Sequence, residues 1–111
     1  MNMRLKRGVT LEGVQWPMKK AIEHADRIWK QLGRELVVTS AAKDPKQLQT
    51  LHAFGFALDF RTFYFRRFTK ENAARLLQRA LGEDYKVLVC STHIHCEYDE
   101  GATASRRYEY S

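Results

Sequence analysis

The chain has 111 residues, 44% of them hydrophobic and 29% charged, which is typical of one small globular domain with a modest core. No stretch approaches the roughly 20 apolar residues of a membrane span, and no signal-peptide-like apolar run follows the basic N-terminus. We therefore expect a protein that stays in the cytoplasm in which it is made. The net charge of +6 favours an anionic partner such as nucleic acid, an acidic membrane surface or a bacterial wall polymer, although scattered basic residues also suit a merely solvated surface.

In chain order, the first predicted elements are a helix, a strand and a loop. Residues 14–33 carry apolar residues at three- and four-residue spacing, with Pro17 suited to the first turn and Gly33 to the helix end. The expected buried stripe consists of Trp16, Met18, Ala21, Ile22, Ala25, Ile28, Trp29 and Leu32. Residues 35–40 are β-branched and predict a short strand. Residues 41–51 are polar, contain a proline and predict a loop.

The second half predicts three further strands and a helix. Residues 55–63 alternate, so Phe56, Leu58 and Phe60 should face one way and Ala57, Asp59 and Arg61 the other. Residues 69–82 predict a helix with Thr69 as N-cap and Gly82 at its end; its expected buried face is Ala73, Leu76, Leu77 and Leu81. Residues 85–90 and 93–98 predict a hairpin. We thus expect one α+β domain over residues 1–111, with a small, mainly antiparallel sheet, two helices and flexible ends at 1–9 and 101–111.

The segment "HIHCEY", residues 93–98, holds the first candidate functional residues. On a strand, His93, His95 and Glu97 share one face, while Ile94, Cys96 and Tyr98 share the other. A pair of histidines at this spacing is a weak indication of metal binding by itself. Two cysteines make no disulfide framework, and a metal site that includes Cys96 is disfavoured because His95 and Cys96 point to opposite faces.

The segment "HAFGFALDF" supplies a second set of candidates. Gly55 permits a tight entry into the strand, and Ala57 leaves room on the face that carries Asp59. A carboxylate on the inner face of a strand flanked by phenylalanines needs a partner. That partner could be Arg61 on the same face, or a metal ion shared with His52 and the "HIH" strand. Two His nitrogens and one carboxylate oxygen are usual ligands of a catalytic zinc, which lowers the pKa of its bound water to about 7.

These two motifs together resemble those of the zinc D-alanyl-D-alanine carboxypeptidases and L-alanyl-D-glutamate endopeptidases. "TLHAFGFALDFRT" is similar to their "S-x-H-x-x-G-x-A-x-D" motif, and "LGEDYKVLVCSTHIHCEYD" to their closing "H-x-H" strand. The similarity covers residues 10–100 and is nearest to small members encoded by bacteriophages and prophages, with a more distant likeness to the hedgehog signalling domain. It implies hydrolysis of peptidoglycan stem peptides by a zinc-activated water. It also implies His52, Asp59 and His95 as zinc ligands, and His93 either as a histidine just outside the ligands or as the catalytic histidine.

The chain departs from this family at two functional positions. The small phage members usually carry a glutamate, the expected general base, at the position of Cys90. They also carry an arginine that holds the substrate carboxylate, whereas here Lys43 is the nearest cation and cannot bind a carboxylate bidentately. His93 or Glu97 could then serve as the base, and Arg61 is a further candidate for substrate binding.

These departures leave several functions open. The first is an endolysin-like zinc metallopeptidase that degrades the bacterial cell wall. The second is a catalytically weakened or inactive zinc-binding structural protein of a phage particle, and a third possibility is that only the fold persists. Either location, the cytoplasm of the host bacterium or the virion, suits a chain of this kind. A different class is a basic nucleic-acid-binding module, because "RTFYFRRF", residues 61–68, interleaves aromatic and arginine residues.

Overall fold

The computed structural model describes residues 3–41 and 55–99. Its elements in chain order are β1 (Arg4–Leu5), α1 (Trp16–Gln31), β2 (Val37–Ser40), β3 (Ala57–Arg61), α2 (Arg67–Leu81), β4 (Tyr85–Val89) and β5 (His93–Tyr98). The strands form one sheet in the order β1-β2-β3-β5-β4. β1 and β2 are parallel, and every other pair is antiparallel. The structure is therefore a small α+β domain with a five-stranded mixed sheet and two helices, as the sequence pattern predicts in its main features.

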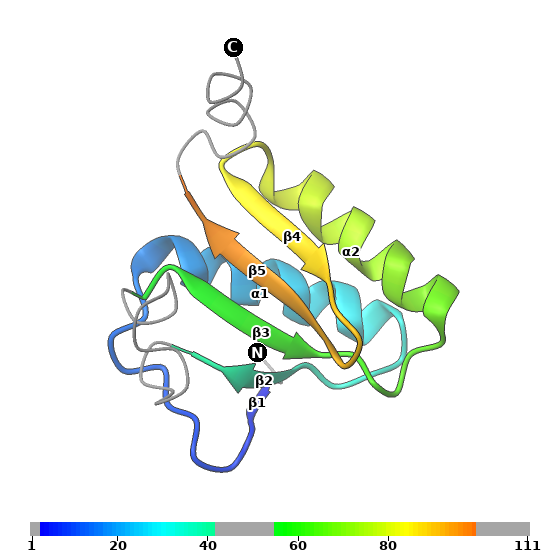
Figure 1. The fold of residues 1–111 in the computed structure, drawn as a ribbon, viewed down its shortest axis with the longest axis horizontal. Coiled ribbons are helices and arrows are strands. Elements are labelled where there is room, and N and C mark those ends of the chain that lie inside the picture. Colours follow the sequence, from blue (N-terminus) through cyan, green and yellow to red (C-terminus); the bar gives the residue numbers. More distant parts are fainter. Residues whose placement is uncertain (1–2, 42–54, 100–111) are drawn as a thin grey trace.

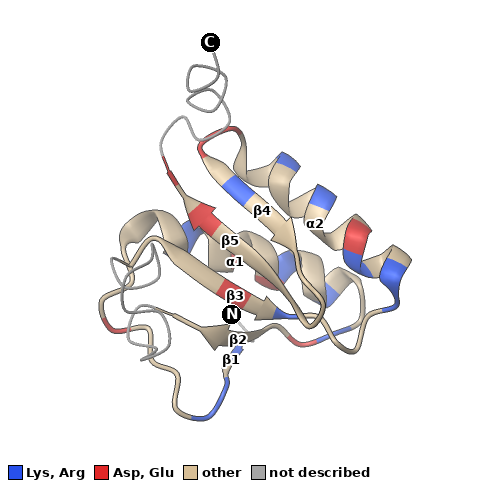
Figure 2. Ribbon diagram, viewed as in Figure 1, with Lys and Arg blue, Asp and Glu red and all other residues tan. Residues whose placement is uncertain are grey.

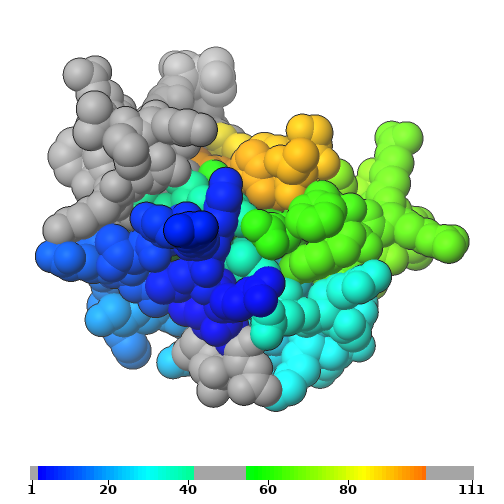
Figure 3. All heavy atoms as spheres, turned by 90° about the horizontal axis from the view of Figure 1, so that it is seen from below, coloured from blue at the N-terminus to red at the C-terminus, as the bar shows by residue number. Residues whose placement is uncertain are grey.

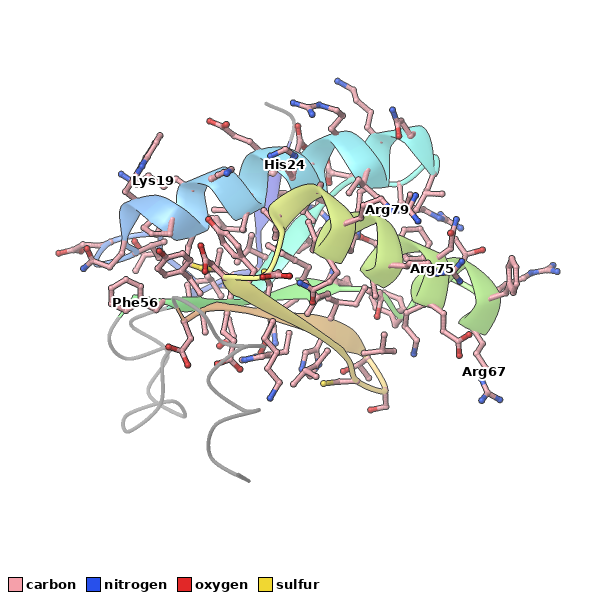
Figure 4. The ribbon with its side chains drawn as sticks, turned by 90° about the horizontal axis from the view of Figure 1, so that it is seen from above. Lys19, His24, Phe56, Arg67, Arg75 and Arg79 are labelled. Carbon is pink, nitrogen blue, oxygen red and sulfur yellow. The ribbon has the colours of Figure 1, made fainter. Side chains whose placement is uncertain are left out.

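Both helices lie on the same side of the sheet (Figures 1 and 4). The core fills the space between the two layers. Helix α1 contributes to this core Met18, Ala21, Ile22, Ala25, Ile28 and Trp29. Helix α2 contributes Ala73, Ala74, Leu77 and Leu81. The sheet contributes Leu58 and Phe60 of β3 and Ile94 and Cys96 of β5. Because side chains alternate along a strand, the intervening residues of β3 and β5 lie on the sheet face opposite the helices. We call this face the open face.

The helix ends agree only partly with their prediction. Pro17 lies in the first turn of α1, and Gly82 caps α2 as predicted. The prediction of Thr69 as N-cap is wrong, because α2 begins at Arg67 with Arg66 as its cap residue. No side chain accepts a hydrogen bond from the first amides of α2, so side-chain capping does not determine where this helix begins. Trp16 is also wrong as a core residue: it is 71% exposed, since it is the first residue of α1 and precedes the turn that packs on the sheet.

Two further expectations need correction. Leu76 is only partly buried, whereas Ala74, which we did not expect in the core, is buried. Within the expected flexible end at residues 1–9, Arg4 and Leu5 form β1. The Arg4 N–H donates to the carbonyl of Leu36, just before β2, and the N–H of Lys6, just after β1, donates to the carbonyl of Val38 in β2. The other expected end, 101–111, lies outside the described residues. Within residues 3–41 and 55–99, no helix is long and apolar enough to cross a membrane.

Candidate functional site

The candidate residues meet at the centre of the open face, where β3 lies beside β5. The register of this antiparallel pair sets Asp59 opposite His95, Arg61 opposite His93 and Ala57 opposite Glu97. Directly opposite residues on neighbouring strands share a face, with their Cβ atoms about 4.5–5.5 Å apart. Figure 2 shows acidic residues on both of these central strands. The sheet therefore brings together two sequence segments whose key residues, Asp59 and His95, are 36 positions apart.

His95 lies between two carboxylates. Its Nδ1 is 3.0 Å from Oδ1 of Asp59, and its Nε2 is 3.2 Å from Oε1 of Glu97. Nε2 of His93 lies 3.7 Å from the other oxygen of Asp59, within ion-pair range but too far for a hydrogen bond. Asp59 thus contacts both histidines, and His95 is held at both ring nitrogens. We call Asp59, His93, His95 and Glu97 the histidine–carboxylate cluster.

The cluster is partly sheltered from solvent. The exposed fractions of its side chains are 11% for Asp59, 16% for Glu97, 21% for His95 and 30% for His93. The hydrogen bond with Asp59 raises the pKa of His95 above its ordinary value of 6.5, with the Asp59 and Glu97 charges acting in the same direction and burial opposing them. A protonated His95 that donates to both carboxylates satisfies both of its ring nitrogens. His93, the most exposed member, is the one best placed to meet a molecule arriving from solvent.

Strand β2 supports Asp59 from its other side, which the sequence did not reveal. Ser40 lies opposite Asp59 across a register shift between Val38 and Ser40, and Ser40 is itself buried. The hydroxyl of Thr39 lies 3.4 Å from the Asp59 carbonyl, to which it donates. A register shift cannot be read from alternation, so "VVTS" alone predicts a strand without indicating this contact.

Cys90 lies at the end of the hairpin beside His93. Its backbone N–H donates to the His93 carbonyl at 2.9 Å, so this residue continues the ladder and lies opposite His93. The turn is held by Lys70 of α2, whose ammonium group donates to the carbonyls of Cys90 and Ser91, both at 3.1 Å. Lys70 was not a candidate from the sequence, where it reads as one more surface lysine of a helix. Cys90 is a half-buried free thiol.

Arg61 lies at the edge of the cluster, opposite His93. Its guanidinium carbon is 5.3 Å from the centroid of the Phe63 ring, a cation–π distance. The Asp59 carboxylate contacts His95 and His93, nearer the middle of the paired strands. Arg61 is thus positioned at the side of the site rather than over its centre.

Two of the sequence-predicted site residues, His52 and Lys43, lie outside the described residues. Within 3–41 and 55–99, no group of three His, Cys, Asp or Glu side chains is arranged to hold a metal ion. In this part of the chain the cluster members contact one another instead of converging on a common point. Of the expected zinc ligands, the structure brings Asp59 and His95 together.

No protein-family model matches the chain, and no curated protein or solved structure matches it either. The relationship to the zinc peptidases therefore remains a proposal.

Proposed function

We propose that this chain is a zinc-dependent peptidase-like domain, with the hedgehog and D-Ala-D-Ala-peptidase fold, that hydrolyses peptidoglycan stem peptides. The observation that carries the proposal is the contact between Asp59 and His95, 3.0 Å apart on the two central strands. These residues come from the two separate motifs that resemble the peptidase family. The proposal includes origin from a bacteriophage or prophage and action in the host bacterium or within a virion.

The donor types of the cluster fit a zinc ion. Zinc in proteins is bound by His nitrogen and Asp or Glu oxygen, commonly three such ligands with a fourth position for water. Asp59 and His95 would bind the zinc ion, and His52 would be its third protein ligand. Glu97 then has a clear role, because ligating histidines usually donate their other ring N–H to a carboxylate. The contact between His95 Nε2 and Glu97 supports Glu97 as a positioning residue for His95 rather than as the general base.

Zinc bound at these residues would activate a water molecule for attack on a peptide carbonyl. His93 is the chain's own residue best placed for proton transfer or for stabilising the developing negative charge, because it lies beside Asp59 and is the most exposed member of the cluster. Arg61, opposite His93, supplies a positive charge at the side of the site for a substrate carboxylate. Lys43, which precedes the "HAFGFALDF" motif in the sequence, is proposed for the same task.

The most direct test is the zinc content of the purified protein and of matched variants. We expect about one zinc per chain in the wild type, and its loss in Asp59→Asn and His95→Ala. His93→Gln should retain zinc while losing activity, because His93 is not a ligand. A wild-type protein that binds no zinc would overturn the proposal, and loss of zinc in the His93 variant alone would exchange the roles of the two histidines.

Cys90 decides how active the enzyme is. The backbone bond between Cys90 and His93 supports its placement next to the catalytic histidine, where the family has a glutamate. General-base assistance contributes about a hundredfold to ten-thousandfold, so we expect weak release of stem peptides by the wild type and stronger release by Cys90→Glu. Cys90→Ser is the control, since it changes the side chain without adding a carboxylate.

The alternative is a structural zinc protein of a phage particle. It is favoured if wild type and Cys90→Glu both bind zinc and neither releases stem peptides. Strong wild-type activity that falls in Cys90→Glu would instead mean that the base is His93 or Glu97.

A further inference from the structure

A row of two aromatic side chains between two arginines leads away from the candidate site. The Arg61 guanidinium lies over Phe63 at 5.3 Å, the Phe63 and Tyr64 centroids are 5.4 Å apart, and the Arg34 guanidinium lies over Tyr64 at 5.4 Å. We call Arg61, Phe63, Tyr64 and Arg34 the arginine–aromatic row. In Figure 3 the green segment that follows β3 lies between the orange β4–β5 turn and the cyan segment at the end of α1.

The row is anchored to the core on one side. The hydroxyl of Tyr64 donates to the Glu35 carbonyl at 2.7 Å. The Tyr64 ring stands edge-on to Phe65, and Phe65 packs 5.7 Å from the buried Trp29. The Tyr64 ring, against which Phe63 lies, is therefore held in place before any ligand arrives, which lowers the entropic cost of binding.

The other side of the row is open to solvent. Phe63 is 66% exposed, so part of its ring surface is accessible to a ligand. In the part of the chain that the structure describes, neither Arg34 nor Arg61 forms an ion pair with a carboxylate. A guanidinium group stacked on a ring keeps its N–H edge available for an anion.

From this arrangement we infer that the arginine–aromatic row binds single-stranded nucleic acid. Proteins that bind single strands combine positive charges along the phosphate backbone with aromatic rings on which successive bases stack. The row supplies both features: the exposed ring of Phe63 for a base, and the guanidinium groups of Arg61 and Arg34 at its two ends for phosphates. A duplex hides its base faces, so only a single strand can use Phe63 in this way.

The row begins next to the histidine–carboxylate cluster, and this position determines which way a bound nucleic acid can run over the surface. Asp59 and Glu97 would repel phosphates, so the backbone is expected to run from Arg61 towards Arg34 and away from the cluster. No member of the row is an expected zinc ligand, although Arg61 is also the residue proposed to meet a substrate carboxylate at the peptidase site. Binding is therefore expected to persist after zinc is removed.

The experiment is fluorescence anisotropy of a labelled oligothymidylate of about 15 nucleotides, a length within the site sizes known for single-strand-binding domains, using protein treated with a chelator. We expect binding that weakens as salt rises. Phe63→Ala should weaken it by about 5- to 150-fold, corresponding to about 1–3 kcal/mol for one stacked base. Phe63→Trp should restore binding, and Arg61→Gln should reduce the slope of log K against log salt by about 0.7.

Two variants serve as matched controls. Trp16→Ala removes another exposed aromatic ring, which is 71% exposed at the start of α1. Arg79→Gln removes one positive charge from α2, where Figure 4 shows its side chain on the helical side of the molecule. Both should bind like the wild type.

Three results would overturn the inference: no binding at low salt, equal effects of the control and row variants, or equal affinity for a duplex of the same length. Unchanged affinity of Phe63→Ala together with full competition by heparin would show general attraction between the basic surface and a polyanion. If Phe63→Ala loses oligonucleotide binding but keeps the zinc content of the wild type, the nucleic-acid site is separate from the proposed zinc site.

Discussion

At the scale of single residues, Gly55 ties the start of β3 to the region before α1. Its φ is +84°, and a Cβ placed there would collide with the Gly13 carbonyl and lie 3.2 Å from the Gln15 nitrogen. That nitrogen donates to the Gly55 carbonyl at 2.9 Å, so the close approach is part of the fold. The sequence-based expectation that Gly55 permits a tight entry to the strand is confirmed.

Gly55→Ala is therefore expected to destabilise the domain by about 3 kcal/mol, because backbone strain and a backbone clash add. Urea unfolding monitored by circular dichroism would measure this change. Gly8→Ala is the control: its φ is +88°, but a Cβ there meets nothing within 4 Å, so only the strain remains, about 1 kcal/mol. Equal effects of the two variants would show that the contact with Gly13 is not important.

The two cysteines should differ sharply in reactivity. Cys96 is fully buried, and burial raises its pKa to about 12, so almost no thiolate forms near neutral pH. Cys90 is half-buried at the hairpin end. We expect one equivalent of maleimide to react rapidly with the native protein and two with the unfolded protein. Mass spectrometry after digestion should find the label on Cys90, and the Cys90→Ser variant should resist labelling until it unfolds. Rapid labelling of native Cys96 would mean that β5 opens readily.

At the scale of elements, the sequence predicted those whose period is strong. Strict alternation located β3 and β5 and assigned their faces correctly, because one face of each is buried against the helices. β1 was missed because a two-residue strand has no period. The start of α2 was misplaced because the favourable N-cap residue Thr69 lies inside the helix, and packing of Ala73 and Leu77 outweighs a capping preference of about 1 kcal/mol.

The candidate site was predictable only in part. Alternation places His93, His95 and Glu97 on one face of their strand and Asp59 on the polar face of another strand, but it cannot tell which residues lie opposite each other. That depends on the β3–β5 register, which sets Asp59 against His95. The partners from other elements, Ser40 on β2 and Lys70 on α2, have no local signal in the sequence. The proposed ligand His52 lies outside the described residues and stays a prediction.

Tyr85 connects β4 to α1, and its ionisation should make that link pH-dependent. Its hydroxyl donates to the Pro17 carbonyl at 2.9 Å, and burial raises its pKa from 10.0 to about 12. Between these values the unfolded chain releases the phenolic proton while the folded chain keeps it. The unfolded state then binds fewer protons, so the free energy of unfolding falls as pH rises above 10.

Tyr85→Phe should accordingly be less stable than the wild type at neutral pH by about 1 kcal/mol, from the lost hydrogen bond. The difference should shrink as pH rises past 10, because the variant has no phenol to ionise at this position. Urea unfolding of both proteins across this range would measure it. A constant difference would mean that Tyr85 ionises equally in both states.

At the scale of the whole molecule, the helices cover one face of the sheet and leave the other to function. The apolar side chains of β3 and β5 serve the core, while their alternate residues form the histidine–carboxylate cluster at the centre of the sheet. β3 and β5 are flanked by β2 and β4, so the cluster stands on the strands least able to fray. A ligand that joins β3 to β5 should thus stabilise the domain as a whole and not only the site.

Zinc is expected to act in this way, which gives a test that does not depend on catalysis. A ligand that binds only the folded state at a hundred times its Kd adds about 2.7 kcal/mol to the free energy of unfolding. For a domain of this size, that corresponds to a rise in Tm of about 10 °C. Differential scanning fluorimetry of chelator-treated protein, with and without added zinc, would measure it. Asp59→Asn and His95→Ala should show little or no rise, because each lacks one of the expected ligands.

His24→Ala is the matched control: His24 lies on α1 on the helical side of the sheet (Figure 4), so its loss removes an imidazole without touching the cluster. A rise that persists in Asp59→Asn and His95→Ala but disappears in His24→Ala would place zinc elsewhere on the chain, and no rise in the wild type would count against a zinc site on the open face.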